Sequence, residues 1–369
     1  MKKGVRMIAG KLKKSMKYVL DIAFIAVILG LTFRLLFKGQ EIGEIISDLA
    51  DAEPSWLMLG AAAVFCFVAG ESAIIFYILR LFKKKIPFLR CLGYSFVGFF
   101  FSFITPSASG GQPAQMYYMR KDGVKVGLSS LIMLLITIAY KSMLVIYGLL
   151  LLIFRGSTVL KYAGRFDWLI GLGFALNIAF VAALFYLLMR PEKVRTAGIK
   201  LVDILTGKGI IREKNSGRYS QKIMRICDTY TLGAEYVRRN PRTMVYIFVM
   251  TAVQRLLLFS VTWIVYRSYG LTGISYVDIL TLQVMIGIAV EMLPLPGAAG
   301  ITEGCFMLCF EAVFGAELVK PALLLSRGLS FYLLLIVGGL ITLIIHISVL
   351  RREKKREGRK KQNEKKASA

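Results

Sequence analysis

Long apolar stretches with almost no charge limit the folds open to this 369-residue chain. About 20 apolar residues make one helical membrane span. Six stretches reach that length: Tyr18–Phe37, Trp56–Phe82, Leu128–Phe154, Trp168–Met189, Met244–Tyr266 and Ala322–Leu350. The short alternating strands of an outer-membrane barrel are absent from the sequence pattern. We therefore expect an all-α polytopic membrane protein, and the mean hydropathy of +0.64 agrees.

Basic segments account for most of the net charge of +26. Residues 1–17 hold seven Lys/Arg and no acid, residues 190–242 hold thirteen against five acids, and residues 351–369 hold ten against three. Basic segments beside membrane spans mark the cytoplasmic side and contact anionic lipid headgroups. This interpretation places both termini in the cytoplasm, and no direct nucleic-acid partner is expected.

Two interrupted apolar segments decide the topology. Segments 91–119 and 279–319 each contain a short apolar part that ends at prolines and glycines. If both segments dip into the membrane and return, the basic loop 190–242 stays cytoplasmic. The favoured topology has six full transmembrane helices plus two re-entrant or broken helices, and the alternative is eight spans. In the favoured topology the second half repeats the first half upside down, which is the inverted-repeat plan of many transporters.

The domain organisation follows from this pattern. Residues 1–17 form a basic cytoplasmic N-terminus, and residues 18–350 form a single transmembrane domain with halves at about 18–154 and 168–350. Residues 351–369 are predicted to be a disordered cytoplasmic tail. Within loop 190–242, apolar residues from Ile223 to Val237 recur at helical spacing. They predict an amphipathic helix that lies either on the inner leaflet or against the bundle.

The first interruption, Ser102–Gln115, is a candidate substrate site. Irregular backbone at membrane depth persists only where protein or a water-filled cavity satisfies its polar groups. Pro113 suits the first turn of a new helix, whose free N–H groups favour an anion such as a lipid phosphate. The predicted binding residues offer hydroxyls, amides and close backbone approach: Ser107, Ser109, Gly110, Gly111, Gln112 and Gln115.

The second interruption, Glu291–Gly304, occupies the matching position in the other half. Paired broken segments of this kind point to a transport site. Pro294, Gly297 and Gly300 are predicted to break the helix and to line the site. Glu303 follows at the expected start of a new helix, where an acid complements the helix dipole.

Ionisable residues within the apolar stretches complete the candidate site. Charges at span centres are costly and usually face a partner or a cavity. Arg255 and Arg327 are predicted to bind a phosphate, whereas Glu71 and Glu303 either pair with them or hold a cationic headgroup or a proton. Structural ion pairs between helices are the alternative. Other charges of this kind are Lys141, Glu291 and Glu311.

Metal and cofactor chemistry has little support in the sequence. The five cysteines form no C-x-x-C pair and the chain has one histidine, so neither a zinc site nor a disulfide framework is expected. No phosphate-binding loop motif and no catalytic Ser-His-Asp order is visible. We expect no cofactor and no catalytic residues.

The two interruptions also carry a family resemblance. The stretches SFITPSASGGQPAQMYYMR and EMLPLPGAAGITEG resemble the membrane domain of bacterial lysyl-phosphatidylglycerol synthase/flippase proteins. The likeness covers about residues 15–350. It implies a location in the bacterial cytoplasmic membrane, a role in lipid flipping between leaflets, and a link to resistance against cationic peptides. In full-length members a separate cytosolic domain transfers the aminoacyl group to the lipid.

The expected function is therefore that of a lipid translocase that handles a phospholipid or an aminoacylated phospholipid such as lysyl-phosphatidylglycerol. Only a basic tail follows Leu350, so the chain resembles a stand-alone member without the synthase domain. The alternatives are a membrane component of a phosphatidylglycerol lysyltransferase and a membrane scaffold for such an enzyme. Expected partners are membrane lipids and, in the alternative readings, a separate lipid-modifying enzyme.

Overall fold

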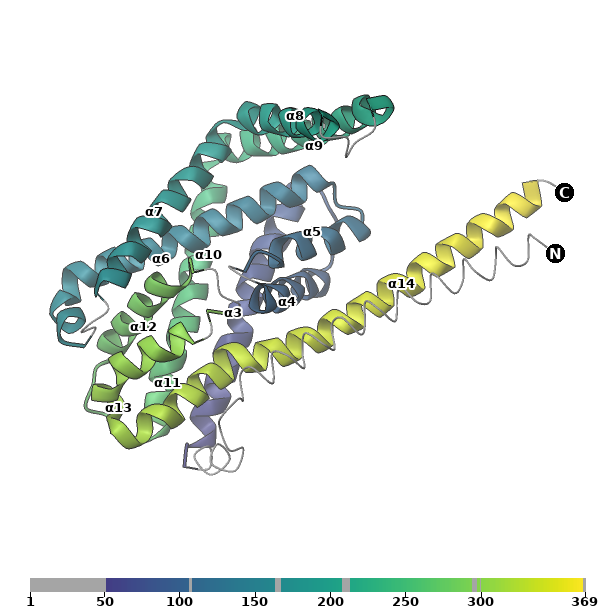
Figure 1. The fold of residues 1–369 in the computed structure, drawn as a ribbon. Helices are drawn as coiled ribbons and strands as arrows, with labels where there is room; N and C mark the ends of the chain where they lie inside the picture. The colour runs from purple at the N-terminus through teal and green to yellow at the C-terminus, as the bar shows by residue number, and fades with distance from the viewer. Residues whose placement is uncertain are drawn as a thin grey trace.

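The computed structural model describes residues 51–105, 108–162, 167–207, 213–293, 297–298 and 300–367, and every regular element within these ranges is a helix. The first predicted span, Tyr18–Phe37, lies outside the described residues. Figure 1 shows the helices, which are α3 (Pro54–Leu81), α4 (Phe88–Ile104), α5 (Gly111–Lys121), α6 (Val126–Tyr162), α7 (Asp167–Met189), α8 (Pro191–Gly207), α9 (Glu213–Arg239), α10 (Pro241–Phe259), α11 (Val261–Ser268), α12 (Tyr276–Val290), α13 (Ile301–Arg327), the π-helical turn η2 (Gly328–Tyr332) and α14 (Leu333–Ala367).

Five helical stretches are long and apolar enough to cross a membrane. They are Pro54–Leu81, Val126–Tyr162, Asp167–Met189, Pro241–Ser268 and Ile301–Arg352. Each contains one of the five predicted spans that fall within the described residues, apart from a one-residue overhang at Phe82. The protein is thus an all-α, multi-pass membrane protein, as the sequence predicts.

Two shorter apolar helices, α4 and α12, occur where the sequence predicts the dips. The chain leaves α4 at Thr105, which has an extended backbone with φ −114° and ψ 145°, as expected for the residue before a proline. It resumes at Gly111 as α5, with Pro113 in the first turn. After α12 the chain resumes at Ile301 as α13, which bends at Gly315, where φ is +82°. We call residues 105–110 the first break and residues 291–300 the second break.

The last long helix of each half packs against the short apolar helix of the other half. Helix α6 of the first half packs along α12, and helix α14 of the second half packs along α4 (Figure 1). The corresponding spans α3 and α10 pack against each other. The predicted inverted repeat of the two halves stays a prediction. The side of the membrane that each end faces stays a prediction.

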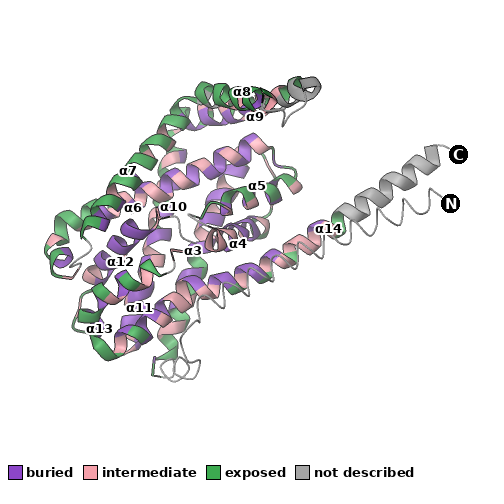
Figure 2. Cartoon of the chain, in the orientation of Figure 1, coloured by how far each residue is buried: buried purple, intermediate pink, exposed green. Residues whose placement is uncertain are grey.

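Burial divides the helices into inner and outer ones (Figure 2). In α12, 11 of the 15 residues are buried, so this short helix lies inside the bundle. Helix α7 is strongly apolar, yet it exposes large side chains such as Trp168 (69%) and Tyr186 (54%). An apolar helix with an exposed surface is suited to contact with lipid.

The basic loop 190–242 contains two helices that stack at one end of the bundle, with α9 packed between α8 and α6. Tyr230, Ala234 and Val237 of α9 are buried, and the Tyr230 hydroxyl donates a hydrogen bond to the carbonyl of Leu187 (3.1 Å). These contacts favour the second of the two predicted arrangements, in which the amphipathic helix packs on the bundle.

The C-terminal segment differs from the predicted disordered tail. Helix α14 continues from the apolar span to Ala367, and it extends beyond the rest of the bundle (Figure 1). Residues 351–367 are rich in Lys, Arg and Glu, which all have high helix propensity. A helix that has already formed in the membrane removes the cost of nucleation for such a segment.

Candidate functional site

The first break is a tight, hydrogen-bonded turn. The N–H of Gly110 donates to the Thr105 hydroxyl (2.8 Å), which in turn donates to the Phe101 carbonyl (2.6 Å). A Cβ on Gly111 would lie 2.6 Å from the Gly98 carbonyl oxygen, so α5 starts against α4 only because this position is glycine. Ser109 is exposed on the turn. The predicted site residue Ser107 lies outside the described residues.

The two glutamines of α5 point to different neighbours. Gln112 donates to the Thr137 hydroxyl on α6. Gln115 is buried, and its Nε2 donates to the Glu71 carboxylate on α3 at 2.6 Å. Gly98 leaves the space that the Gln115 amide fills. These bonds tie the first break to two of the long spans through neutral donors.

The second break is closed by an ion pair. Glu303 accepts a hydrogen bond from the N–H of Gly300 (2.6 Å), which caps α13. The same carboxylate accepts from Nε of Arg327 (2.8 Å), and Nη2 of Arg327 donates to the Gly297 carbonyl (3.2 Å). We call Gly297, Glu303 and Arg327 the Arg327 cluster. The predicted residue Pro294 lies outside the described residues.

The two breaks meet inside the bundle. Gly297 has a φ of +57°, and a Cβ there would lie 2.5 Å from the ring of Phe331 and 3.5 Å from the Phe103 carbonyl oxygen. The rings of Phe103 and Phe331 are in contact, with centroids 4.6 Å apart. Phe103 lies in the last turn of α4 and Gly297 lies in the second break, so the two breaks come together here, and Phe331 of η2 packs against both. Gly300 also has a positive φ, +86°, but its Cβ position faces open space.

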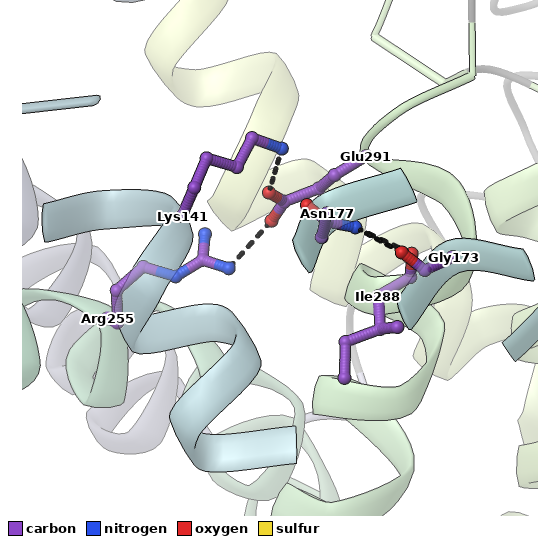
Figure 3. Close-up of polar contacts among 6 residues, drawn as sticks. All are labelled: Lys141, Gly173, Asn177, Arg255, Ile288 and Glu291. Carbon is purple, nitrogen blue, oxygen red and sulfur yellow. Dashed lines mark hydrogen bonds and ion pairs between the residues drawn. The ribbon is translucent and has the colours of Figure 1, made fainter. Parts of the chain in front are cut away.

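A second charged group lies on three helices, and Figure 3 shows it. Glu291, at the end of α12, forms ion pairs with Lys141 of α6 (3.0 Å) and Arg255 of α10 (2.8 Å). We call these three residues the Arg255 cluster. The Arg255 side chain is completely buried, and its guanidinium lies over the rings of Tyr140 (4.1 Å) and Phe259 (4.5 Å). Such contacts stabilise a desolvated cation.

The structure brings the candidate residues together as three neighbouring units rather than one. Glu71 pairs with Gln115, Glu303 pairs with Arg327, and Arg255 pairs with Glu291 instead of Glu71. Lys141 and Glu291 were not among the predicted binding residues. The signal that identifies them is the same as for Arg255, namely a charge within an apolar stretch.

The part of the chain that matches a known family includes all three groups of residues. A model of the lysylphosphatidylglycerol synthase TM region matches residues 18–338. The chain belongs to this family. The lysylphosphatidylglycerol synthase TM region thus includes both breaks, the Arg255 cluster and the Arg327 cluster. None of the curated proteins matches the chain.

Proposed function

We propose that this member of the lysylphosphatidylglycerol synthase TM family moves a lipid between the two leaflets of the bacterial cytoplasmic membrane. One observation carries the proposal: two broken-helix hairpins from matching positions of the chain meet at Phe103, Gly297 and Phe331. Broken helices that meet at the interface of two repeated halves are where transporters bind their substrates.

The proposed substrate is a phospholipid, including an aminoacylated phospholipid such as lysyl-phosphatidylglycerol. The family description names that lipid. Arg255, within the long span α10, keeps charge-assisted donors for a phosphate, which loses its hydration on the way through the membrane. Translocation of lysyl-phosphatidylglycerol, whose two ammonium groups outweigh its phosphate, to the outer leaflet would lower the negative charge of the cell surface, which would account for a link to cationic-peptide resistance.

A leaflet assay on the full-length chain tests the proposal. The protein is reconstituted into phosphatidylcholine vesicles with a fluorescently labelled phosphatidylglycerol, lysyl-phosphatidylglycerol or phosphatidylcholine, and dithionite is added outside. Without translocation dithionite bleaches only the outer leaflet, whereas with translocation it bleaches both. We expect bleaching of both leaflets for at least one of the first two lipids.

Gly111→Val is the test variant, because a side chain at this position collides with the backbone of α4. We expect this variant to reach the membrane but to lose translocation. Gly171→Val on α7 is the matched control, since a Cβ there faces open space. If dithionite bleaches only the outer leaflet of vesicles that contain the unchanged protein, whichever lipid is labelled, the proposal is contradicted.

The family description also supports a second candidate, a membrane component of phosphatidylglycerol lysyltransferase that works with a separate enzyme. The two candidates differ in what a deletion strain lacks. Loss of a translocase changes the distribution of the lipid between leaflets and leaves its total amount unchanged. Loss of a synthase component lowers the total amount of lysyl-phosphatidylglycerol.

A further inference from the structure

The Arg255 cluster carries an unbalanced charge. It contains two cations, Lys141 and Arg255, and one carboxylate, Glu291, and within the described parts of the chain neither cation forms an ion pair with any other acid. Side-chain exposure is 12% for Lys141, 0% for Arg255 and 23% for Glu291. A buried excess charge at membrane depth is costly. The cluster is therefore suited to a second anion.

Arg255 keeps donors available for such an anion. One nitrogen, Nη2, donates to Glu291, whereas Nε and Nη1 are buried and have no hydrogen-bond partner among the described residues. The two aromatic rings lie against the guanidinium and leave its hydrogen-bonding edge for polar partners. In Figure 3 the second terminal nitrogen points toward the side of the cluster on which Lys141 lies. A phosphate accepts hydrogen bonds from two nitrogens of one guanidinium.

Glu291 differs from the two cations in its position. Lys141 and Arg255 lie within the long spans α6 and α10, whereas Glu291 is the C-cap residue that directly follows the short helix α12, at the start of the second break. One turn earlier, Asn177 of α7 donates a hydrogen bond to the Ile288 carbonyl (3.3 Å) and so holds the end of α12. A shift of the chain beyond Ile288 would therefore displace the Glu291 carboxylate and leave both cations in place.

From these observations we infer that Glu291 is an internal competitor that occupies the binding position of an anionic phosphate group between Arg255 and Lys141. The inference rests on the proposed function and deepens it, since it names the chemical group that is bound and the residue that must leave. With Glu291 in place the cations are partly neutralised and stable without substrate. When the phosphate arrives it takes over the donors of Arg255, and the return of Glu291 releases it.

Direct binding measurements on the full-length protein in a neutral detergent test the inference. The probes are short-chain phosphatidylglycerol, short-chain phosphatidylcholine and inorganic phosphate, which distinguish a lipid headgroup from a free phosphate. Glu291→Gln removes the competing charge, so we expect phosphatidylglycerol to bind at least about tenfold more tightly. Arg255→Gln and Lys141→Gln should weaken binding. Glu317→Gln, on the exposed surface of α13, is the matched control and should change nothing.

Glu291→Asp keeps the charge and the fold but shortens the reach of the carboxylate, so an intermediate gain is expected. If both Glu291 variants bind phosphatidylglycerol no more tightly than the unchanged chain, Glu291 does not compete and the inference is wrong. Equal gains for phosphatidylglycerol and inorganic phosphate support the competition and assign the site to any phosphate. A gain in binding without translocation of any lipid leaves the competition intact and contradicts only the proposed function.

Discussion

The Arg255 cluster and the Arg327 cluster both pair an arginine with a glutamate at a helix break, but they differ in how many hydrogen-bond donors of the arginine have a partner. Arg327 donates to Glu303 and to the Gly297 carbonyl, and the carboxylate also caps α13. Among the described residues, the one hydrogen bond of Arg255 goes to Glu291, and the guanidinium lies over the rings of Tyr140 and Phe259. The first arrangement fixes the backbone of a break. The second retains charge and donors for another partner.

This difference indicates that one cluster has a structural role and the other a binding role. A satisfied, charge-balanced pair holds the shape of the second break, and its removal is expected to affect stability. An unbalanced cluster on rigid spans is suited to binding, and its removal is expected to affect both stability and substrate affinity. Three sets of variants separate these effects.

The largest effect is expected at Arg255. Arg255→Ala leaves a cavity where a fully buried side chain packs against Tyr140 and Phe259, while Lys141 still pairs with Glu291, and it should lower the free energy of unfolding by about 3 kcal/mol. Arg255→Lys keeps the charge but loses the planar donor set, so it should restore only part of the stability and binding. Thermal unfolding in detergent measures the stability, and binding of short-chain phosphatidylglycerol measures the affinity. Arg242→Ala, an exposed arginine on the same helix, is the control.

A smaller effect is expected where the two breaks meet. Both Gly297 and Gly300 have positive φ, but only at Gly297 does a side chain meet another one, the ring of Phe331. Gly297→Ala should therefore cost about 2 kcal/mol from strain and crowding together, and Gly300→Ala about 1 kcal/mol from strain alone. Unfolding midpoints in detergent give the comparison. Phe331→Leu should recover part of the loss at Gly297, and equal losses at the two glycines would show that the crowding is absent.

The smallest effect is expected at Glu303. Glu303→Gln retains an oxygen for the Gly300 N–H but loses the charge that faces Arg327, which should cost about 1 kcal/mol. Unlike Glu291→Gln, it should leave the affinity for phosphatidylglycerol unchanged, because Arg327 still donates to the Gly297 carbonyl. An increase in affinity equal to that of Glu291→Gln would show that the two clusters are alike.

Much of the fold follows from local sequence. The five predicted spans within the described residues are confirmed, because an apolar stretch of sufficient length must form a helix in lipid. Both breaks also follow from sequence, since Pro113 suits the first turn of α5 and the glycines of the second break permit the positive φ found at Gly297 and Gly300. The helical tail was missed because its high charge density favours disorder by composition, whereas its connection to α14 favours the helix.

The charged residues of the site were visible in the sequence, but their partners were not. Lys141 and Glu291 are 150 residues apart, and Arg255 and Glu291 are 36 apart. Hydropathy shows that each charge needs a partner or a cavity, but it does not show which helices lie next to each other. Only the packing of α6 and α10 around the end of α12 decides that Arg255 meets Glu291 rather than Glu71. The same packing leaves one positive charge in excess, because the energy of a buried charge depends on its neighbours in space and not on its neighbours along the chain.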